Sequence, residues 1–101
     1  MDDIVIITSY SGYIKYINRA GETSLGYPFA QLNGKHISEL KSPESQFELS
    51  KEHFFDSRRT WTGNLDLKNK HGRVIRTSLK STPMMREKDI VSRAFVLRVQ
   101  F

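Results

Sequence analysis

The stretch from Thr60 to Lys80 limits the fold most, because its side chains alternate with a period of two around a tight turn. Before the turn, one face carries Trp61, Gly63, Leu65 and Leu67. After the turn, one face carries Ile75, Thr77 and Leu79. The turn itself, Asn69-Lys70-His71-Gly72, has the composition of a hairpin loop. This pattern predicts two antiparallel strands, over 60–68 and 73–80, each with one face on a core.

The N-terminal residues carry a second hairpin signal. Residues 3–8 are short and rich in β-branched side chains, as strands are. Residues 13–17 alternate, and this places Ile14 and Tyr16 together on one face. Residues 9–12 between them have turn composition, so two antiparallel strands are expected here as well.

Short helical signals follow this hairpin. Asn18 is a suitable N-cap for a helix over 19–25, since its side-chain oxygen can accept from an amide of the first turn. Gly26 suits the left-handed residue that ends such a helix. Further helical turns are expected over 28–34 and 35–40.

The longest helix is predicted over 43–57. Ser42 would cap it, and Pro43 suits the first helical position. At about 100° per residue, an inward face forms from Phe47, Phe54 and Phe55.

The C-terminal part completes the pattern with a predicted polar loop over 83–89 and a last strand over 91–101. Helical segments gathered between two groups of strands indicate an α+β fold, an antiparallel sheet with helices over one face. The 101 residues are expected to form one domain, 1–101.

The amino-acid composition excludes several classes of function. The chain has no cysteine, which excludes disulfides and thiol chemistry and fits a reducing, cytoplasmic compartment. The net charge is +5, but the basic residues never form a continuous block, so no nucleic-acid site is expected. No apolar run approaches the ~20 residues of a membrane span, so this segment should not contact a membrane, even if its parent protein is membrane-anchored. No nucleophile elbow or phosphate-binding glycine loop indicates an enzyme.

Four motifs in order carry a family resemblance. They are Gly12–Asn18, read as G-x-I-x-Y-x-N; Leu25–Tyr27 with Leu32–Lys35; Trp61–Leu65; and Lys70–Gly72. Each is weak alone, but together and at this spacing they resemble the PAS domain over the whole chain. At the C-terminus, Val99–Phe101 stands where the family often has an Asp-Ile-Thr segment that couples the domain to its effector.

The resemblance implies a five-stranded antiparallel sheet of order 2-1-5-4-3, with short helices and one longer helix packed on one face. It implies a sensory or signal-relay domain without catalytic activity. Such a domain regulates an attached output domain, such as a histidine kinase of a two-component system or a cyclic-dinucleotide enzyme. The outer sheet face is expected to form a homodimer or to pack a flanking helix.

The resemblance also allows cofactors to be tested residue by residue. Ile37 stands where light-oxygen-voltage relatives have their reactive cysteine, so FMN photochemistry is not expected. Their flavin-binding amides fall at Leu67, Thr77 and near Leu97, and aliphatic groups cannot replace those donors and acceptors. FAD stays open as an alternative, because FAD-binding relatives also begin this hairpin with Trp-x-Gly, as Trp61–Gly63 does.

Haem and metal sites are not expected. The axial position of haem-binding relatives falls near Gln46, and helical phase turns His53 away from the phenylalanine face. His36 and His71 are expected at the surface, and the three histidines show no metal-ligand spacing.

Two site hypotheses remain open at this stage. An inner pocket, which is either filled core or a small-molecule site, would be lined by Tyr16, Phe47, Ser50, Phe54, Trp61, Leu65, Thr77, Leu79 and Leu97. A dimer or relay face on the outer side of the sheet would comprise Val74, Arg76, Ser78, Val96 and Arg98. The chain is therefore either a signal-relay module or a dedicated ligand or cofactor receptor.

Overall fold

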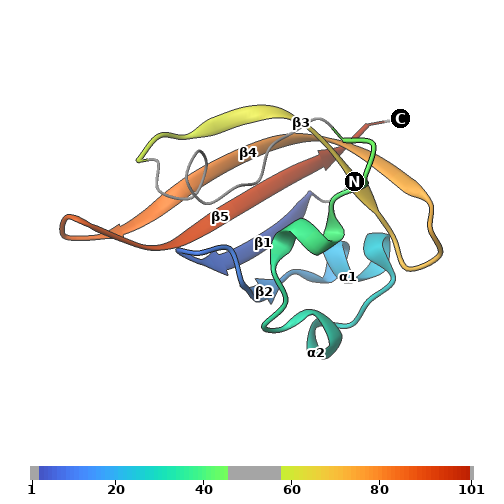
Figure 1. Cartoon of the computed structure of the whole chain (residues 1–101), viewed down its shortest axis with the longest axis horizontal. Helices are drawn as coiled ribbons and strands as arrows, with labels where there is room; N and C mark the ends of the chain where they lie inside the picture. The colour runs from blue at the N-terminus through green and yellow to red at the C-terminus, as the bar shows by residue number, and fades with distance from the viewer. Residues whose placement is uncertain (1–2, 46–57, 101) are drawn as a thin grey trace.

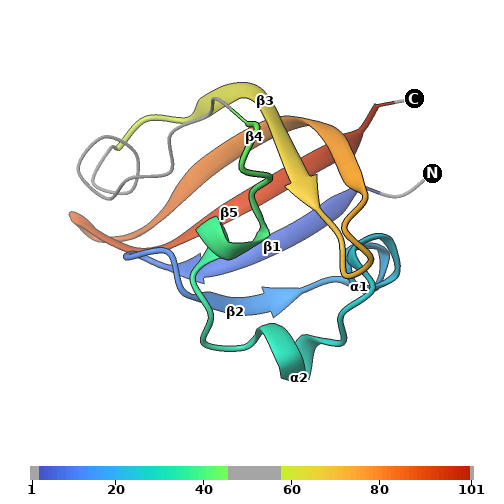
Figure 2. The same ribbon diagram turned by 45° about the vertical axis from the view of Figure 1, so that its right-hand side comes forward.

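The computed structural model describes residues 3–45 and 58–100, which form one five-stranded antiparallel sheet and three short helices. The strands are β1 (Ile4–Ser9), β2 (Ile14–Ile17), β3 (Trp61–Lys68), β4 (Val74–Arg86) and β5 (Asp89–Val99). The helices are α1 (Arg19–Leu25), α2 (Phe29–Leu32) and the 3-10 helix η1 (Ile37–Leu40). The strand order is β2-β1-β5-β4-β3, so the predicted fold class is confirmed (Figure 1, Figure 2).

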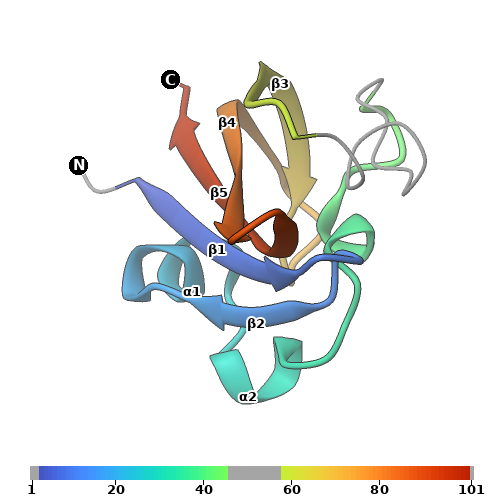
Figure 3. The same ribbon diagram turned by 90° about the vertical axis from the view of Figure 1, so that its left-hand side faces the viewer.

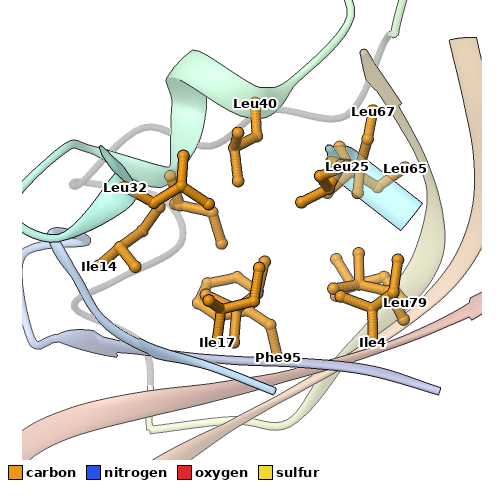
Figure 4. Packing of buried hydrophobic residues seen from close by; sticks show 13 residues of the cluster. Ile4, Ile14, Ile17, Leu25, Leu32, Leu40, Leu65, Leu67, Leu79 and Phe95 are labelled. Carbon is orange, nitrogen blue, oxygen red and sulfur yellow. The ribbon is translucent and has the colours of Figure 1, made fainter. Parts of the chain in front are cut away.

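One face of the sheet packs on the hydrophobic core, because inward and outward residues alternate along the strands. Figure 3 shows how strongly the sheet twists from β2 to β3. The helices add Leu25, Leu32, Ile37 and Leu40 to the core. The strands add Ile4, Ile6, Ile14, Ile17, Leu65, Leu67, Leu79, Phe95 and Leu97 (Figure 4).

Helix α1 begins and ends as the sequence predicts. The Asn18 side-chain oxygen accepts hydrogen bonds from the amides of Gly21 (2.9 Å) and Val5 (3.0 Å). Its side-chain nitrogen donates to the carbonyl of Asp3 (2.8 Å). Gly26 closes the helix at φ 79°, a left-handed conformation that costs glycine little. Asn18 thus caps the helix and also ties it to β1.

Gly21 allows α1 to approach the sheet closely, and this supports a prediction. A Cβ atom at this position would lie 2.6 Å from Cγ1 of Ile17 and 3.0 Å from Cγ2 of Ile4. We expect Gly21→Ala to lower the free energy of unfolding by about 1–2 kcal/mol, because overpacking outweighs the gain in helix propensity. Urea denaturation measures this change. The exposed Thr23→Ala in the same helix is the control and should stay within about 0.5 kcal/mol; an equal or higher midpoint for Gly21→Ala would contradict the close packing.

Tyr16 is not an inward residue, which corrects the sequence prediction. The register shifts between Ile7 and Thr8, so that Ile7 pairs with Tyr16 and Thr8 pairs with Ile14. This bulge interrupts the alternation of β2. Ile14 and Ile17 are therefore both buried, whereas Tyr16 is 48% exposed.

The predicted polar loop over 83–89 is also wrong. β4 continues to Arg86 and β5 starts at Asp89, so that only Glu87 and Lys88 connect them. Pro83 does not end the strand, because β3 stops at the pair Trp61–Ser81 and leaves β4 as an edge strand, where proline is tolerated.

The predicted helix over 43–57 lies largely outside the described residues. In the part that the structure describes, Pro43 and Glu44 form a turn and not a helical start. The amide of Ser45 donates to the carbonyl of Ser42 (3.0 Å). Gln46, Phe47, Ser50, His53, Phe54 and Phe55 all fall outside the described ranges. Across the two described ranges, no helix has the length and apolar character needed to cross a membrane.

Candidate functional site: the two faces of the sheet

The inner-pocket residues that the structure describes lie together in the core. Leu65, Leu79 and Leu97 are buried on β3, β4 and β5, where Leu79 pairs with Leu97 and Leu65 pairs with Thr77. Thr77 is also buried, and its hydroxyl donates to the carbonyl of Leu65 (2.6 Å). Trp61 is half-buried and packs against this cluster. The inner face therefore presents aliphatic side chains, and its threonine hydroxyl is already engaged within the sheet.

The sequence does not predict the buried arginine on the inner face, Arg93, since its pattern shows only that the basic residues form no continuous block. Arg93 is fully buried, and burial lowers the pKa of its guanidinium. Its Nε donates to Oγ of Ser81 (2.7 Å), and its Nη2 donates to the carbonyl of Arg59 (2.6 Å). Its position in the strand could have revealed its burial. Arg93 stands two residues before Phe95 and four before Leu97, so the alternation of strand side chains places it on the same inward face.

A cleft of about 280 Å³ opens outside the core between β2, α2 and η1. Its floor is apolar, and its rim carries Tyr27, Gln31, Lys35, His36 and Glu39. His36 was expected at the surface but is only partly exposed. It caps η1 by accepting from the amide of Ser38 (3.2 Å), and its Nε2 lies 3.0 Å from the carbonyl of Ser11. His36 thus fastens η1 to the β1–β2 turn, and His71 is exposed as predicted.

Among the described residues, no group of three or more His, Cys, Asp or Glu side chains is placed to hold a metal ion.

The outer face of the sheet carries an apolar stripe that the sequence located only in part. Val5 pairs with Val96, and Ile7 pairs with both Ala94 and Tyr16. We call these five residues, across β2, β1 and β5, the outer stripe. Tyr16 and Val96 are its most exposed members, at 48% and 36%. Apolar side chains therefore follow one another over three neighbouring strands on the side away from the core.

The other residues predicted for the relay face are exposed or half-buried, but they do not form one patch. Lys80 pairs with Val96, and Val74 lies six residues further along β4, about 20 Å away at the strand rise. Val74 is therefore separate from the outer stripe, which corrects its grouping with Val96. Ser78 and Arg98 pair with each other beside the stripe.

Beside the outer stripe lies a shallow hollow of about 400 Å³. Its lining comprises Asp3, Thr62, Gly63, Ser78, Leu79, Lys80, Val96 and Arg98. Arg98 Nε lies 3.4 Å from an oxygen of Asp3, an exposed ion pair of little energetic weight. Nε2 of Gln100 donates to Ser78 (2.6 Å) and to Asn64 (3.3 Å), so the last described residue is linked to β4 and β3. The lining of the hollow is thus mainly apolar and includes two basic side chains, Lys80 and Arg98.

Comparison with known proteins agrees with this architecture. The PAS domain family model matches residues 2–98. The human high affinity cAMP-specific and IBMX-insensitive 3',5'-cyclic phosphodiesterase 8A is 30% identical over 86 residues. That match covers 83% of this chain and 10% of the phosphodiesterase, so the chain spans about a tenth of the length of this relative.

Two solved structures show the same fold at low identity. A light-oxygen-voltage domain, studied with a flavin analogue, superposes with a TM-score of 0.86 at 17% identity, covering 98% of this chain and 78% of the other. A PAS domain from a two-component sensor histidine kinase superposes with a TM-score of 0.79 at 13% identity, covering 97% and 85%. With its strand order, its core and the match over 2–98, the chain belongs to the PAS domain family.

Proposed function

We propose that this chain is a signal-relay domain that regulates an attached output domain through the outer face of its sheet, as a homodimer. The observation that carries the proposal is the outer stripe, because apolar side chains on the side away from the core favour coverage by a partner. The basic stems of Lys80 and Arg98 beside it can lay their methylene groups over apolar surface.

The comparisons support a role as one part of a larger protein. The matched relative is a cyclic phosphodiesterase many times longer than this chain, and one structural neighbour comes from a sensor histidine kinase. By analogy with these two proteins, the proposed output domain is a histidine kinase or an enzyme that acts on a cyclic nucleotide.

The alternative of a dedicated FAD receptor is less well supported by the described residues. A flavin ring needs donors and acceptors along its polar edge. The inner face has Leu65, Leu67 and Leu97 in the core, and the hydroxyl of Thr77 donates to a carbonyl. These side chains favour relay through the outer face, which needs no cofactor, over a flavin site on the described part of the inner face.

The proposal predicts weak self-association that depends on Val96. We expect a dissociation constant in the micromolar range or weaker, because several basic side chains border the stripe. Association should tighten between about 0.1 M and 1 M salt, where the Debye length falls from about 10 Å to 3 Å and repulsion is screened. Val96→Asp should weaken the dimer at least about tenfold, equivalent to about 1.4 kcal/mol, because association would have to remove water from the new carboxylate within the apolar stripe.

Sedimentation equilibrium at both salt concentrations tests this prediction. Val74→Asp is the matched control, because it adds the same charge on the same face at a similar exposure, about 20 Å from the stripe. A chain that stays monomeric at high protein concentration in both salts refutes dimerisation. A Val96→Asp variant that associates like the unmodified chain moves the interface away from the stripe.

A further inference from the structure

The β4–β5 hairpin extends beyond the rest of the sheet. β3 ends its pairing with β4 at Ser81, and β1 ends its pairing with β5 at Ser92. Residues 84–91, which we call the hairpin arm, therefore lie past both neighbouring strands, and the arm projects at one end of the molecule (Figure 1). Its two strands pair with each other through Met85–Ile90 and Arg86–Asp89.

The hairpin arm exposes large apolar side chains. Met84 and Met85 are each 41% exposed, and Val91 is 45% exposed. The register shift between Met84 and Met85 leaves Val91 as an extra residue opposite them. Methionine side chains are flexible and polarisable, so that they adapt to irregular apolar surfaces. Such a group on a projecting ribbon favours contact with a partner.

Basic side chains flank this apolar group. Arg86 and Lys88 belong to the arm and are exposed, and Arg58 and Arg59 precede β3. Nη2 of Arg58 donates to the carbonyl of Lys88 (2.6 Å), which fastens the arm to the chain that leads into β3. The carbonyl of Arg59 accepts from the buried Arg93. Arg58 is thus held against the arm, next to Arg59 and close to the arm's own Arg86 and Lys88.

The charges at the tip favour a protein partner over a membrane. Glu87 and Asp89 stand at the turn, so an anionic lipid surface that met the arm end-on would meet two carboxylates first. The methionines lie further back on the strands, between the turn and the sheet. Met84 and Met85 are neighbours on β4, so their side chains lie on opposite faces of the hairpin arm. Because β3 ends its pairing at Ser81, the edge of β4 is open here, and a segment that lies along this edge would contact both methionines and reach the flanking cations.

We propose that the hairpin arm is a docking site for an acidic amphipathic segment of a partner protein, separate from the outer stripe. The apolar residues of that segment would pack along the open edge of β4, on Met84 and Met85. Its carboxylates would pair with Arg86, Lys88 and the neighbouring Arg58. Charge complementarity selects the partner, and the adaptable methionines let it vary in sequence.

A titration of the isotope-labelled chain with a designed peptide tests the site by NMR. The probe is a helical peptide of about 18 residues with leucines at positions i, i+3, i+4 and i+7, flanked by glutamates. We expect amide shift changes concentrated on residues 84–91. The same peptide with lysines in place of the glutamates should bind at least about tenfold more weakly, because its charges repel the flanking cations.

Variants and vesicles separate the alternatives. Met84→Ser with Met85→Ser should weaken binding of the acidic peptide at least about fivefold, while Val74→Ser, at similar exposure, should leave it unchanged. If that double variant fails to fold, Arg86→Glu with Lys88→Glu gives the same test through charge. Three outcomes would each overturn the proposal. They are amide shift changes centred on the outer stripe, binding of the lysine peptide as tight as that of the acidic peptide, and binding to phosphatidylserine vesicles that is stronger than binding to the acidic peptide.

Discussion

Replacing Arg93 by alanine is expected to lower the free energy of unfolding by about 3 kcal/mol. The substitution removes charge-assisted hydrogen bonds to Ser81 and to the carbonyl of Arg59, each worth about 1.5–3 kcal/mol, and leaves a cavity in their place. Release of the buried charge from its desolvated position offsets part of this loss. The urea midpoint measures the change.

Two further variants make the test of Arg93 specific. Arg93→Lys keeps the charge but has one nitrogen where Nε and Nη2 make two separate hydrogen bonds, so its loss should be intermediate. Arg98→Ala lies on the same strand, but its side chain is 78% exposed, so it should change stability by less than about 0.5 kcal/mol. A stability loss for Arg93→Ala no larger than that of Arg98→Ala would mean that the guanidinium contributes nothing to the fold.

The second large effect is expected for Trp61. It starts β3, pairs with Ser81 and packs against the core while half-buried. Trp61→Ala should cost about 2–4 kcal/mol, the lower part of this range reflecting the exposed part of the ring. Because Trp61 is the one tryptophan in the sequence, unfolding has to be followed by far-UV circular dichroism.

Trp61→Phe is the control, and it should lose less than about 1.5 kcal/mol because most of the apolar area is kept. Trp61 and Arg93 both contact Ser81 through pairing or hydrogen bonding, so their double variant should depart from additivity by at least about 0.5 kcal/mol. An unchanged midpoint for Trp61→Ala would instead point to an exposed ring, and the alternative of a ligand or FAD receptor would gain support.

Helix caps and tight turns could be predicted from the sequence, because neighbouring residues determine them. Asn18 and Gly26 bound α1 as expected, and the 69–72 turn joins β3 to β4. The order of the strands came from the family resemblance, since alternation reveals which face is buried but not which strand is the neighbour. The burial of Leu65, Leu79 and Leu97 together in the core follows from the alternation of side chains combined with the strand order.

The wrong predictions have physical causes that a single strand pattern does not reveal. The bulge in β2 shifted Tyr16 to the outer face, because one extra residue reverses the alternation. Pro83 predicts the start of a loop, but its effect depends on whether a neighbouring strand needs an N–H donor at that position, which proline lacks. Val74 and Val96 share a face of the sheet, but the strand pairing places them far apart.

The strand order has a consequence for synthesis on the ribosome. β1 leaves the exit tunnel first, yet it belongs between β2 and β5, and β5 leaves last. Ile4 and Ile6 must therefore stay without their second strand until nearly the whole domain has been translated. β4 pairs with β3 and β5 pairs with β4, so these two strands can each associate with the preceding strand as they emerge. The nascent N-terminal hairpin is thus the part on which chaperones would act, and slow codons before residue 89 would lengthen that interval.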